Sequence, residues 1–139
     1  MAETYRGVAF PWLCDQQGHL TTSQYMLMFD VASYHLMDLL TRGIGDDPAL
    51  SWADVRHEID YRAEVPAGAL VVIDSMIEAM GTSSLRAVHE MRSTDGAVVH
   101  ARMLAVSVRF DKAARRSAPL SPALRERAAA LLPVVEPTA

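Results

Sequence analysis

The sequence contains little cysteine, no excess of basic residues and no long apolar run. Cys14 is the only cysteine among 139 residues, so an intrachain disulfide is excluded. Lysine and arginine (13) are outnumbered by aspartate and glutamate (17), and the net charge of −4 argues against a protein that binds nucleic acid through its phosphates. There is no signal-peptide pattern and no apolar run of about 18 residues. We therefore expect a soluble, cytoplasmic protein with neither a membrane nor a nucleic-acid partner.

Metal-ligand spacing such as His-Glu-x-x-His is also missing, so no metal site is expected among the five histidines. Internal repeats and low-complexity tracts are absent too. Half of the residues are apolar and 22% are charged, which is typical of an ordinary folded protein. A chain of this length can bury one hydrophobic core but not two. The sequence thus predicts a single domain over residues 1–139.

The first half of the chain predicts one strand and one long helix. Residues 5–12 are rich in strand-forming residues, and Pro11 near their end favours a peripheral strand. Thr22 or Ser23 can cap a helix that runs to about residue 40. Apolar residues cover nearly the whole circumference of this helix, which predicts that it is buried on most sides. Glycines follow it at 43 and 45 and end it.

The second half predicts about four long strands, over residues 54–65, 69–80, 83–93 and 97–110. Residues 94–96, Thr-Asp-Gly, form a hairpin signal between the last two. In the first of these strands, alternation places Val55, His57, Ile59 and Tyr61 on one face. His57, like His89 on the third, lies on a mainly apolar face, which favours packing or an interface.

A short helix over residues 121–132 is predicted to follow the strands, because Ser121-Pro122 pairs an N-cap with a proline in the first turn. The core is expected over residues 5–112, with the rest as a C-terminal extension. One helix that is apolar all round must be wrapped by a curved sheet. The fold class is therefore α+β, with a long central helix inside an antiparallel sheet of about five strands.

Asp15 lies a few residues before the long helix, in the stretch CDQQGHLTTSQYM. A carboxylate can act as a general base or as a nucleophile. The free N–H groups at the helix start, from Thr22 to Tyr25, can polarise a carbonyl oxygen. Gly18 permits a turn that brings Asp15 back towards this helix start. The alternative is that Asp15 only caps a turn.

Residues 15–32, DQQGHLTTSQYMLMFDVA, are similar to the Asp-x-x-Gly-His signature of hotdog-fold acyl-CoA thioesterases, in their 4-hydroxybenzoyl-CoA thioesterase-like branch. Residues 57–91 continue the likeness through three strands and the Pro-x-Gly turn at residues 66–68. The resemblance covers roughly residues 5–112. One departure is Thr21-Thr22, because many relatives have Asn-Asn at these positions.

The resemblance implies a hotdog fold and a homodimer or homotetramer with active sites at the dimer interface. It also implies an acyl-CoA or acyl-carrier thioesterase whose coenzyme A is part of the substrate, with no other cofactor. In such a site Asp15 is the catalytic carboxylate, and the backbone N–H of Thr22, with Ser23 beside it, polarises the carbonyl. Gly18, His19 and Tyr25 are then the candidate substrate-binding residues.

Several alternatives stay open at the level of sequence. His19 either bonds to the turn backbone or orients Asp15 or the substrate, and Tyr25 either packs in the core or touches the substrate. Cys14 as a thiol nucleophile is disfavoured, because nothing in the sequence brings it to His19 in space. A hydratase or dehydratase would carry a longer motif that is missing here. A catalytically silent acyl-binding module is the third candidate function.

Overall fold

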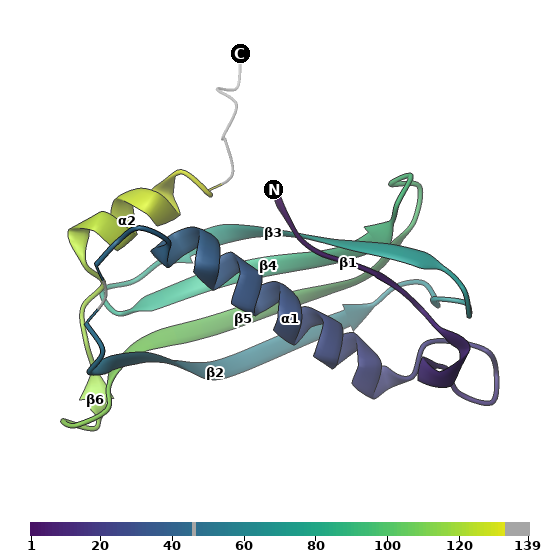
Figure 1. Cartoon of the computed structure of the whole chain (residues 1–139), viewed down its shortest axis with the longest axis horizontal. Coiled ribbons are helices and arrows are strands. Elements are labelled where there is room, and N and C mark those ends of the chain that lie inside the picture. Colours follow the sequence, from purple (N-terminus) through teal and green to yellow (C-terminus); the bar gives the residue numbers. More distant parts are fainter. Residues whose placement is uncertain (46, 133–139) are drawn as a thin grey trace, which may run out of the picture.

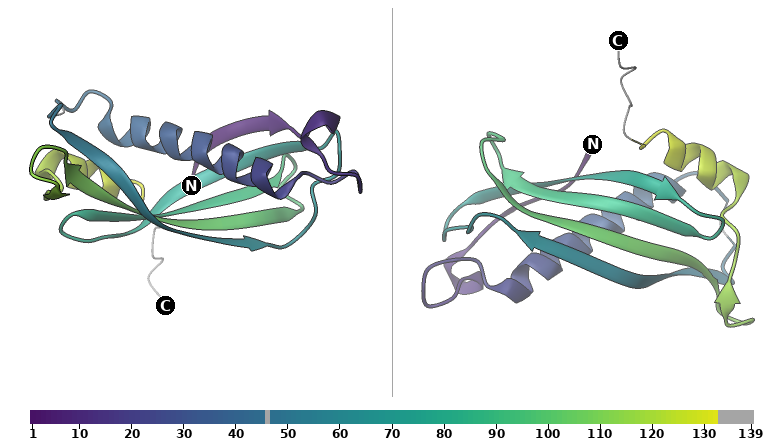
Figure 2. Two further views of the ribbon diagram at one scale, coloured as in Figure 1. Left: turned by 90° about the horizontal axis from the view of Figure 1, so that it is seen from below. Right: turned by 180° about the vertical axis from the view of Figure 1, so that it is seen from behind.

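The computed structural model describes residues 1–45 and 47–132, so the predicted domain is described except for residue 46 and residues 133–139. It is an α+β structure in which a curved antiparallel sheet wraps one long helix (Figures 1 and 2). The elements are β1 Ala2–Val8, the 3-10 helix η1 Pro11–Leu13, α1 Thr22–Thr41, β2 Leu50–Tyr61, β3 Leu70–Met80, β4 Ser84–Ser93, β5 Val99–Asp111, β6 Arg116–Ser117 and α2 Pro122–Ala129.

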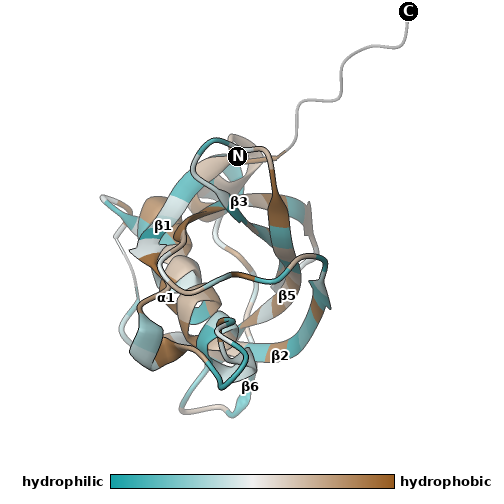
Figure 3. Cartoon of the chain, turned by 90° about the vertical axis from the view of Figure 1, so that its right-hand side faces the viewer, coloured by the Kyte–Doolittle hydropathy of each residue, from teal (hydrophilic) through white to brown (hydrophobic). Residues whose placement is uncertain are grey.

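The strand order is β1-β3-β4-β5-β2, and the two-residue β6 pairs with β5. All pairings are antiparallel. The sheet curves around one side of α1, as the view along the molecule's long axis shows (Figure 3). This arrangement confirms the predicted hotdog fold. The first strand is peripheral as expected, although it begins at Ala2, and Pro11 starts η1 instead of ending the strand.

The long helix α1 begins and ends close to the predicted positions, but its cap differs. Its N-cap is Thr21, with an extended backbone (φ −65°, ψ 141°) and no side-chain hydrogen bond, so the expected cap at Thr22 or Ser23 is wrong. The helix stops after Thr41, and Gly43 adopts φ +75°, a conformation that glycine tolerates best. Its buried side chains are Tyr25, Met28, Phe29, Ala32, Leu36 and Leu40.

The opposite face of α1 is exposed. Leu27, Val31 and Tyr34 are 57%, 42% and 74% accessible, although all three are large and apolar or aromatic. The expectation that α1 is buried on most sides is therefore wrong for the single chain. The physical reason is that the concave sheet covers only one side of the helix and no other described element covers the outer side.

A β-bulge in β2 changes which side chains face the helix. The register between β2 and β5 shifts between Asp54 and Arg56. Val55 is the extra residue and is 61% exposed, so its predicted place on one face with His57, Ile59 and Tyr61 is wrong. Asp54 instead pairs with Ser107 on the inner side, where their side chains hydrogen-bond at 2.7 Å.

The C-terminal helix α2 closes one end of the core. Leu124 and Ala128 pack in one cluster with Leu36 and Leu40 of α1. The side chain of Ser121 accepts a hydrogen bond from the backbone N–H of Leu124, as the predicted N-cap requires. The helix ends at Ala129, earlier than the predicted residue 132. Neither helix in the described part of the chain is long and apolar enough to cross a bilayer.

Candidate active site

Asp15 lies in a tight turn that it holds together with its own side chain. Its Oδ1 accepts hydrogen bonds from the backbone N–H groups of Gln17 (2.8 Å) and His19 (3.3 Å). The Gly18 N–H donates to the Asp15 carbonyl at 3.0 Å, and Gly18 has φ +77°. Within the described residues no group donates to Oδ2. Asp15 thus caps its turn through Oδ1, as the alternative prediction stated. Its Oδ2 is not used by the turn and can accept a proton or contact a ligand.

This turn is anchored to the core through its flanks. Leu20 donates its backbone N–H to Val65 at 2.8 Å, and Ala67 donates to Gly18 at 2.9 Å. Leu20 and Val65 are both buried, so the turn is held by hydrogen bonds over an apolar support. Asp15 itself is exposed. An exposed carboxylate on a rigidly attached turn is well placed to meet a ligand arriving from solvent.

The start of α1 follows the turn directly. Thr21 donates its N–H to the Leu13 carbonyl, and Gln24 donates to Thr21. In the described structure, the N–H groups of Thr22 and Ser23 donate to no carbonyl outside the helix, and the helix geometry offers them none inside it. They carry the positive end of a 20-residue helix, which favours a negatively charged or polarised oxygen.

Tyr25 lies beneath this corner and is 6% exposed. Its ring packs edge-on against Tyr61 at 5.1 Å between centroids. Burial raises the pKa of its phenol, and the charges of Glu64 and Asp15 act in the same direction, while a hydrogen bond to the backbone of Val65 acts against them. Tyr25 is therefore a core residue whose phenol stays protonated, and it lies within electrostatic range of Asp15.

Cys14 and His19 have structural contacts. The Cys14 thiol is directed towards the carbonyl oxygens of Ala9 (3.9 Å) and Phe10 (3.5 Å). His19 serves the turn through its backbone and forms an isolated bridge with Pro66. In the described part of the chain the His19 ring makes no hydrogen bond. The structure does not bring the thiol and the imidazole together as a catalytic pair.

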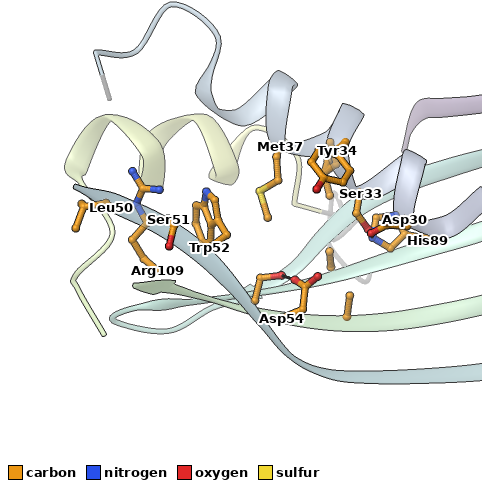
Figure 4. A pocket seen from close by; sticks show the side chains of 14 residues that line it. Asp30, Ser33, Tyr34, Met37, Leu50, Ser51, Trp52, Asp54, His89 and Arg109 are labelled. Carbon is orange, nitrogen blue, oxygen red and sulfur yellow. Dashed lines mark hydrogen bonds between the residues drawn. The ribbon is translucent and has the colours of Figure 1, made fainter. Parts of the chain in front are cut away.

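A separate cavity of about 370 Å³ lies further along α1, between that helix and the inner face of β2, β4 and β5 (Figure 4). Its floor contains Ala87 and Ala105, which are paired on neighbouring strands. Two small side chains at one position leave room that larger residues would fill. Tyr34, Met37 and Trp52 line its walls.

His89 lies at the polar end of this cavity and is 1% exposed. Its Nδ1 is 2.5 Å from the Ser75 hydroxyl and its Nε2 is 3.3 Å from the Ser33 hydroxyl. Ser75 in turn contacts Thr4 at 2.7 Å. Burial lowers the pKa of His89 to about 4, His57 contributes in the same direction and Asp54 opposes it. The imidazole is therefore neutral at pH 7, and its burial agrees with the packing or interface role expected for a histidine on a mainly apolar face.

Asp54 also lines the cavity, and sequence reasoning missed it. Its Oδ1 accepts the Ser107 hydroxyl, and its Oδ2 is 3.8 Å from Nε2 of His57. Strict alternation along β2 places Asp54 on the other face, and only the bulge turns it inward. No sequence signal indicated that bulge. No metal-binding cluster of acidic, histidine or cysteine side chains occurs in the part of the chain that the structure describes.

Comparison with known proteins identifies the family and the fold of the chain. A family model described as the thioesterase-like superfamily matches residues 8–128. A search of curated protein sequences found no match. Among solved structures, a thioesterase from Thermus thermophilus complexed with coenzyme A and zinc is 25% identical, with a TM-score of 0.77 over 93% of this chain and 92% of that one.

Two further structures share the fold at lower identity. A Staphylococcus aureus protein in complex with CoA is 12% identical, with a TM-score of 0.83 over 98% of this chain and 90% of that one. A 1,4-dihydroxy-2-naphthoyl-CoA thioesterase from Synechocystis is 18% identical, with a TM-score of 0.75 over 91% of this chain and 95% of that one. Because the family model spans most of the chain and the predicted fold is observed, the chain belongs to the thioesterase-like superfamily and is a thioester hydrolase.

Proposed function

We propose that this protein is an acyl-CoA thioesterase in which Asp15 supplies the carboxylate and the start of α1 polarises the thioester carbonyl. One observation carries the proposal. Asp15 keeps one carboxylate oxygen without a donor from the described residues, and its turn leads into the start of α1, where the N–H groups of Thr22 and Ser23 also lack a partner among those residues. A base or nucleophile beside an oxyanion site is what thioester hydrolysis requires.

Two routes fit this arrangement. In the first, Asp15 takes a proton from a water molecule while the water oxygen bonds to the carbonyl carbon. In the second, the carboxylate itself attacks and forms an anhydride that water then hydrolyses. In both, the C–S bond breaks, the thiol leaves with a proton and the free acid remains. The N–H groups of Thr22 and Ser23 stabilise the negative oxygen that develops at the carbonyl.

Coenzyme A is the proposed leaving group, and it enters as part of the substrate, not as a resident cofactor. Two proteins that share this fold were solved with coenzyme A bound, which supports a CoA thioester over a carrier-protein thioester. Neither route above needs a metal ion or a redox group. Proton transfer and carbonyl polarisation are sufficient.

We also propose that the working form is at least a homodimer. β2 is an edge strand of 12 residues that exposes Val55 and Tyr61, and α1 exposes Leu27 and Val31 on its outer side. Long edges and apolar patches of this kind favour self-association. A two-fold axis can pair β2 with its copy in antiparallel fashion.

Such a pairing has a consequence for the site. β2 runs from the cavity, at Trp52, to the Asp15 corner, where Tyr61 meets Tyr25 (Figure 1). Antiparallel pairing therefore places the Asp15 corner of one copy near the cavity of the other. A homotetramer would need a second contact surface in addition.

Release of free thiol from a panel of acyl-CoA esters tests the proposed hydrolysis. We expect turnover by the wild type and a loss of about a thousandfold in Asp15→Asn. Asparagine keeps an Oδ1 acceptor for Gln17 and His19, so the turn and the fold should persist. Asp38→Asn, at an exposed carboxylate that pairs with Arg42 elsewhere on α1, is the matched control. Full turnover in Asp15→Asn, or hydration of an enoyl-CoA without thiol release, would contradict the proposal.

A further inference from the structure

The buried polar chain behind the cavity has a definite hydrogen-bond direction. The Thr4 hydroxyl donates to the Ile73 carbonyl at 3.2 Å, which uses its only hydrogen. Ser75, 2.7 Å from Thr4, must then donate to it. The Ser75 hydrogen is used in turn, so Ser75 can only accept from Nδ1 of His89 at 2.5 Å. In the neutral imidazole this places the proton on Nδ1 and leaves Nε2 as an acceptor.

Nε2 of His89 lies at the end of this hydrogen-bond chain that is nearer the cavity. Its neighbour is Ser33, whose hydroxyl also lies 3.0 Å from the Phe29 carbonyl one helical turn back. Ser33 has a single hydrogen, so it can satisfy the carbonyl or Nε2 but not both. A ligand that supplies a hydrogen-bond donor to Nε2 would resolve this competition, because Ser33 could then keep its bond to Phe29.

Two other side chains at this end are also acceptors. Asp54 and Asp30 contribute carboxylates, and the Ser107 hydroxyl already donates to Asp54. The one cationic side chain among the lining residues is Arg109, which lies at the other end, over the ring of Trp52 at 5.1 Å. Figure 4 shows Asp54, Ser33 and His89 towards one end and Arg109 towards the other.

The position of the cavity also limits how it can be reached. Asp30, its first lining residue on α1, follows Thr22 by eight residues, which is about 12 Å along a helix. A short acyl group held at the helix start of the same chain would end before the polar residues. In the antiparallel dimer proposed above, the Asp15 corner of the second copy instead approaches the open side of this cavity.

We propose, on the basis of the function proposed above, that this cavity receives the acyl group and selects acyl groups that carry a hydrogen-bond donor, a hydroxyl or an ammonium group, over unsubstituted ones. Nε2 of His89 accepts from a hydroxyl. The carboxylates of Asp54 and Asp30 favour an ammonium group. The apolar walls at Met37 and Trp52 contact the methylene groups between the donor and the thioester. An unsubstituted chain would supply no donor to Nε2 of His89, which then has only the shared Ser33 hydroxyl, and would displace water from the two carboxylates without replacing its hydrogen bonds, which costs binding free energy.

Binding to the Asp15→Asn protein measures this selectivity without turnover. The ligands are hexanoyl-CoA and its ω-hydroxy and ω-amino derivatives, titrated by calorimetry. We expect the two substituted esters to bind about tenfold more tightly than hexanoyl-CoA. Equal binding of all three esters would overturn the inference. Hydrolysis by the wild type, measured in parallel, reports separately on the proposed function, so the two failures are distinguishable.

Variants at the polar end of the cavity identify the groups that cause the preference for substituted acyl groups. His89→Asn retains an N–H for Ser75 but removes the Nε2 acceptor, and we expect the preference for the hydroxy ester to disappear. The control His100→Asn changes another buried histidine, 5% exposed and bonded to the Ala63 carbonyl, and should keep the preference. A preference for the hydroxy ester that survives His89→Asn would contradict the assignment.

Two further variants keep the inference testable if His89→Asn does not fold. Asp54→Asn retains the bond from Ser107 and removes a charge, so the ω-amino ester should lose its advantage while hexanoyl-CoA is unaffected. Asp38→Asn is again the matched control. Ala105→Leu fills the floor of the cavity and should weaken binding of all three esters at least tenfold. Undiminished binding in Ala105→Leu would show that the acyl group lies elsewhere.

Discussion

The Asp15 corner and the His89 cavity lie along the same helix but are built in different ways. At the corner, an exposed carboxylate is held by its own turn, through bonds to Gln17 and His19, two and four residues away. In the cavity, a buried imidazole is held by Ser75 and Ser33, which are 14 and 56 residues away in sequence. The first site depends on local backbone geometry and the second on the packing of four elements. They should therefore respond differently to mutation and to pH.

The largest expected effect tests whether the backbone at the corner is chemically active. Thr22→Pro removes the N–H of the first helical residue, where proline is tolerated, and the extended backbone of Thr21 suits a residue before proline. Thr22→Ala keeps the N–H and serves as the control. We expect kcat to fall about a hundredfold to a thousandfold in Thr22→Pro only. Equal kcat values in the two variants would exclude this N–H as an oxyanion donor.

The second effect tests whether burial lowers the pKa of His89 in the cavity. The pKa of His89 is about 4 in the folded protein, below the ordinary value of 6.5. Between these values the unfolded chain binds more protons, so stability falls as pH decreases from 6.5 to 4. The full loss is about 3 kcal/mol in free energy of unfolding.

Denaturant unfolding at a series of pH values measures this loss. Asp54 and His57 act on His89 in opposite directions, and Asp95 and Glu3 have lowered pKa values that also cost stability in acid. The slope of the unfolding free energy against pH is therefore compared between the wild type and His89→Asn. Parallel slopes above pH 4 would show that the pKa of His89 is the same in the folded and unfolded states and is not lowered by burial.

The third effect concerns the exposed face of α1. In the proposed dimer this face is part of the contact that brings the Asp15 corner of one copy near the His89 cavity of the other. Leu27→Asp places a charge on the exposed face of α1 and should weaken self-association tenfold or more, while the stability of the single chain changes by less than about 0.5 kcal/mol. Light scattering against the 15.2 kDa chain mass reports the state. Ala123→Asp, on the exposed side of α2, is the control. A wild type that is monomeric at all concentrations would contradict the dimer.

The smallest effect returns to the local geometry of the Asp15 turn. Gly18 has φ +77°, and no atom lies within 4 Å of a Cβ added there, so Gly18→Ala costs only backbone strain. We expect a loss of about 1 to 2 kcal/mol in unfolding free energy by thermal denaturation. Gly45→Ala, with equal space but no positive φ, should cost clearly less. Equal losses would show that the left-handed turn at Gly18 is not required.

Features that depend on neighbours in sequence were largely predictable. The long helix and the order of the four long strands followed from local patterns, and glycine at 18 and 43 correctly marked turns. The cap of α1 was misplaced by one or two residues because Thr21, Thr22 and Ser23 are all good N-cap types and local propensity cannot choose among them.

Features that depend on distant contacts were not predictable. Alternation assigned Val55 to an inner face, but the bulge in β2 placed Asp54 there and left Val55 exposed. The apolar circumference of α1 indicated burial all round, whereas the sheet covers one side and the stripe at Leu27, Val31 and Tyr34 is left open. A helical pattern reports which residues avoid water and not which molecule covers them.

The amino-acid sequence by itself determined the order of the elements, the long apolar helix, and the carboxylate and glycine of the turn ahead of that helix, because these follow from side-chain type and spacing along a few residues. Only the tertiary structure decided that Asp54, His89 and Ser107 share one cavity. Strand register and a bulge set which side chains meet across the sheet, and the energy of those pairings is distributed over β2, β4, β5 and α1 together.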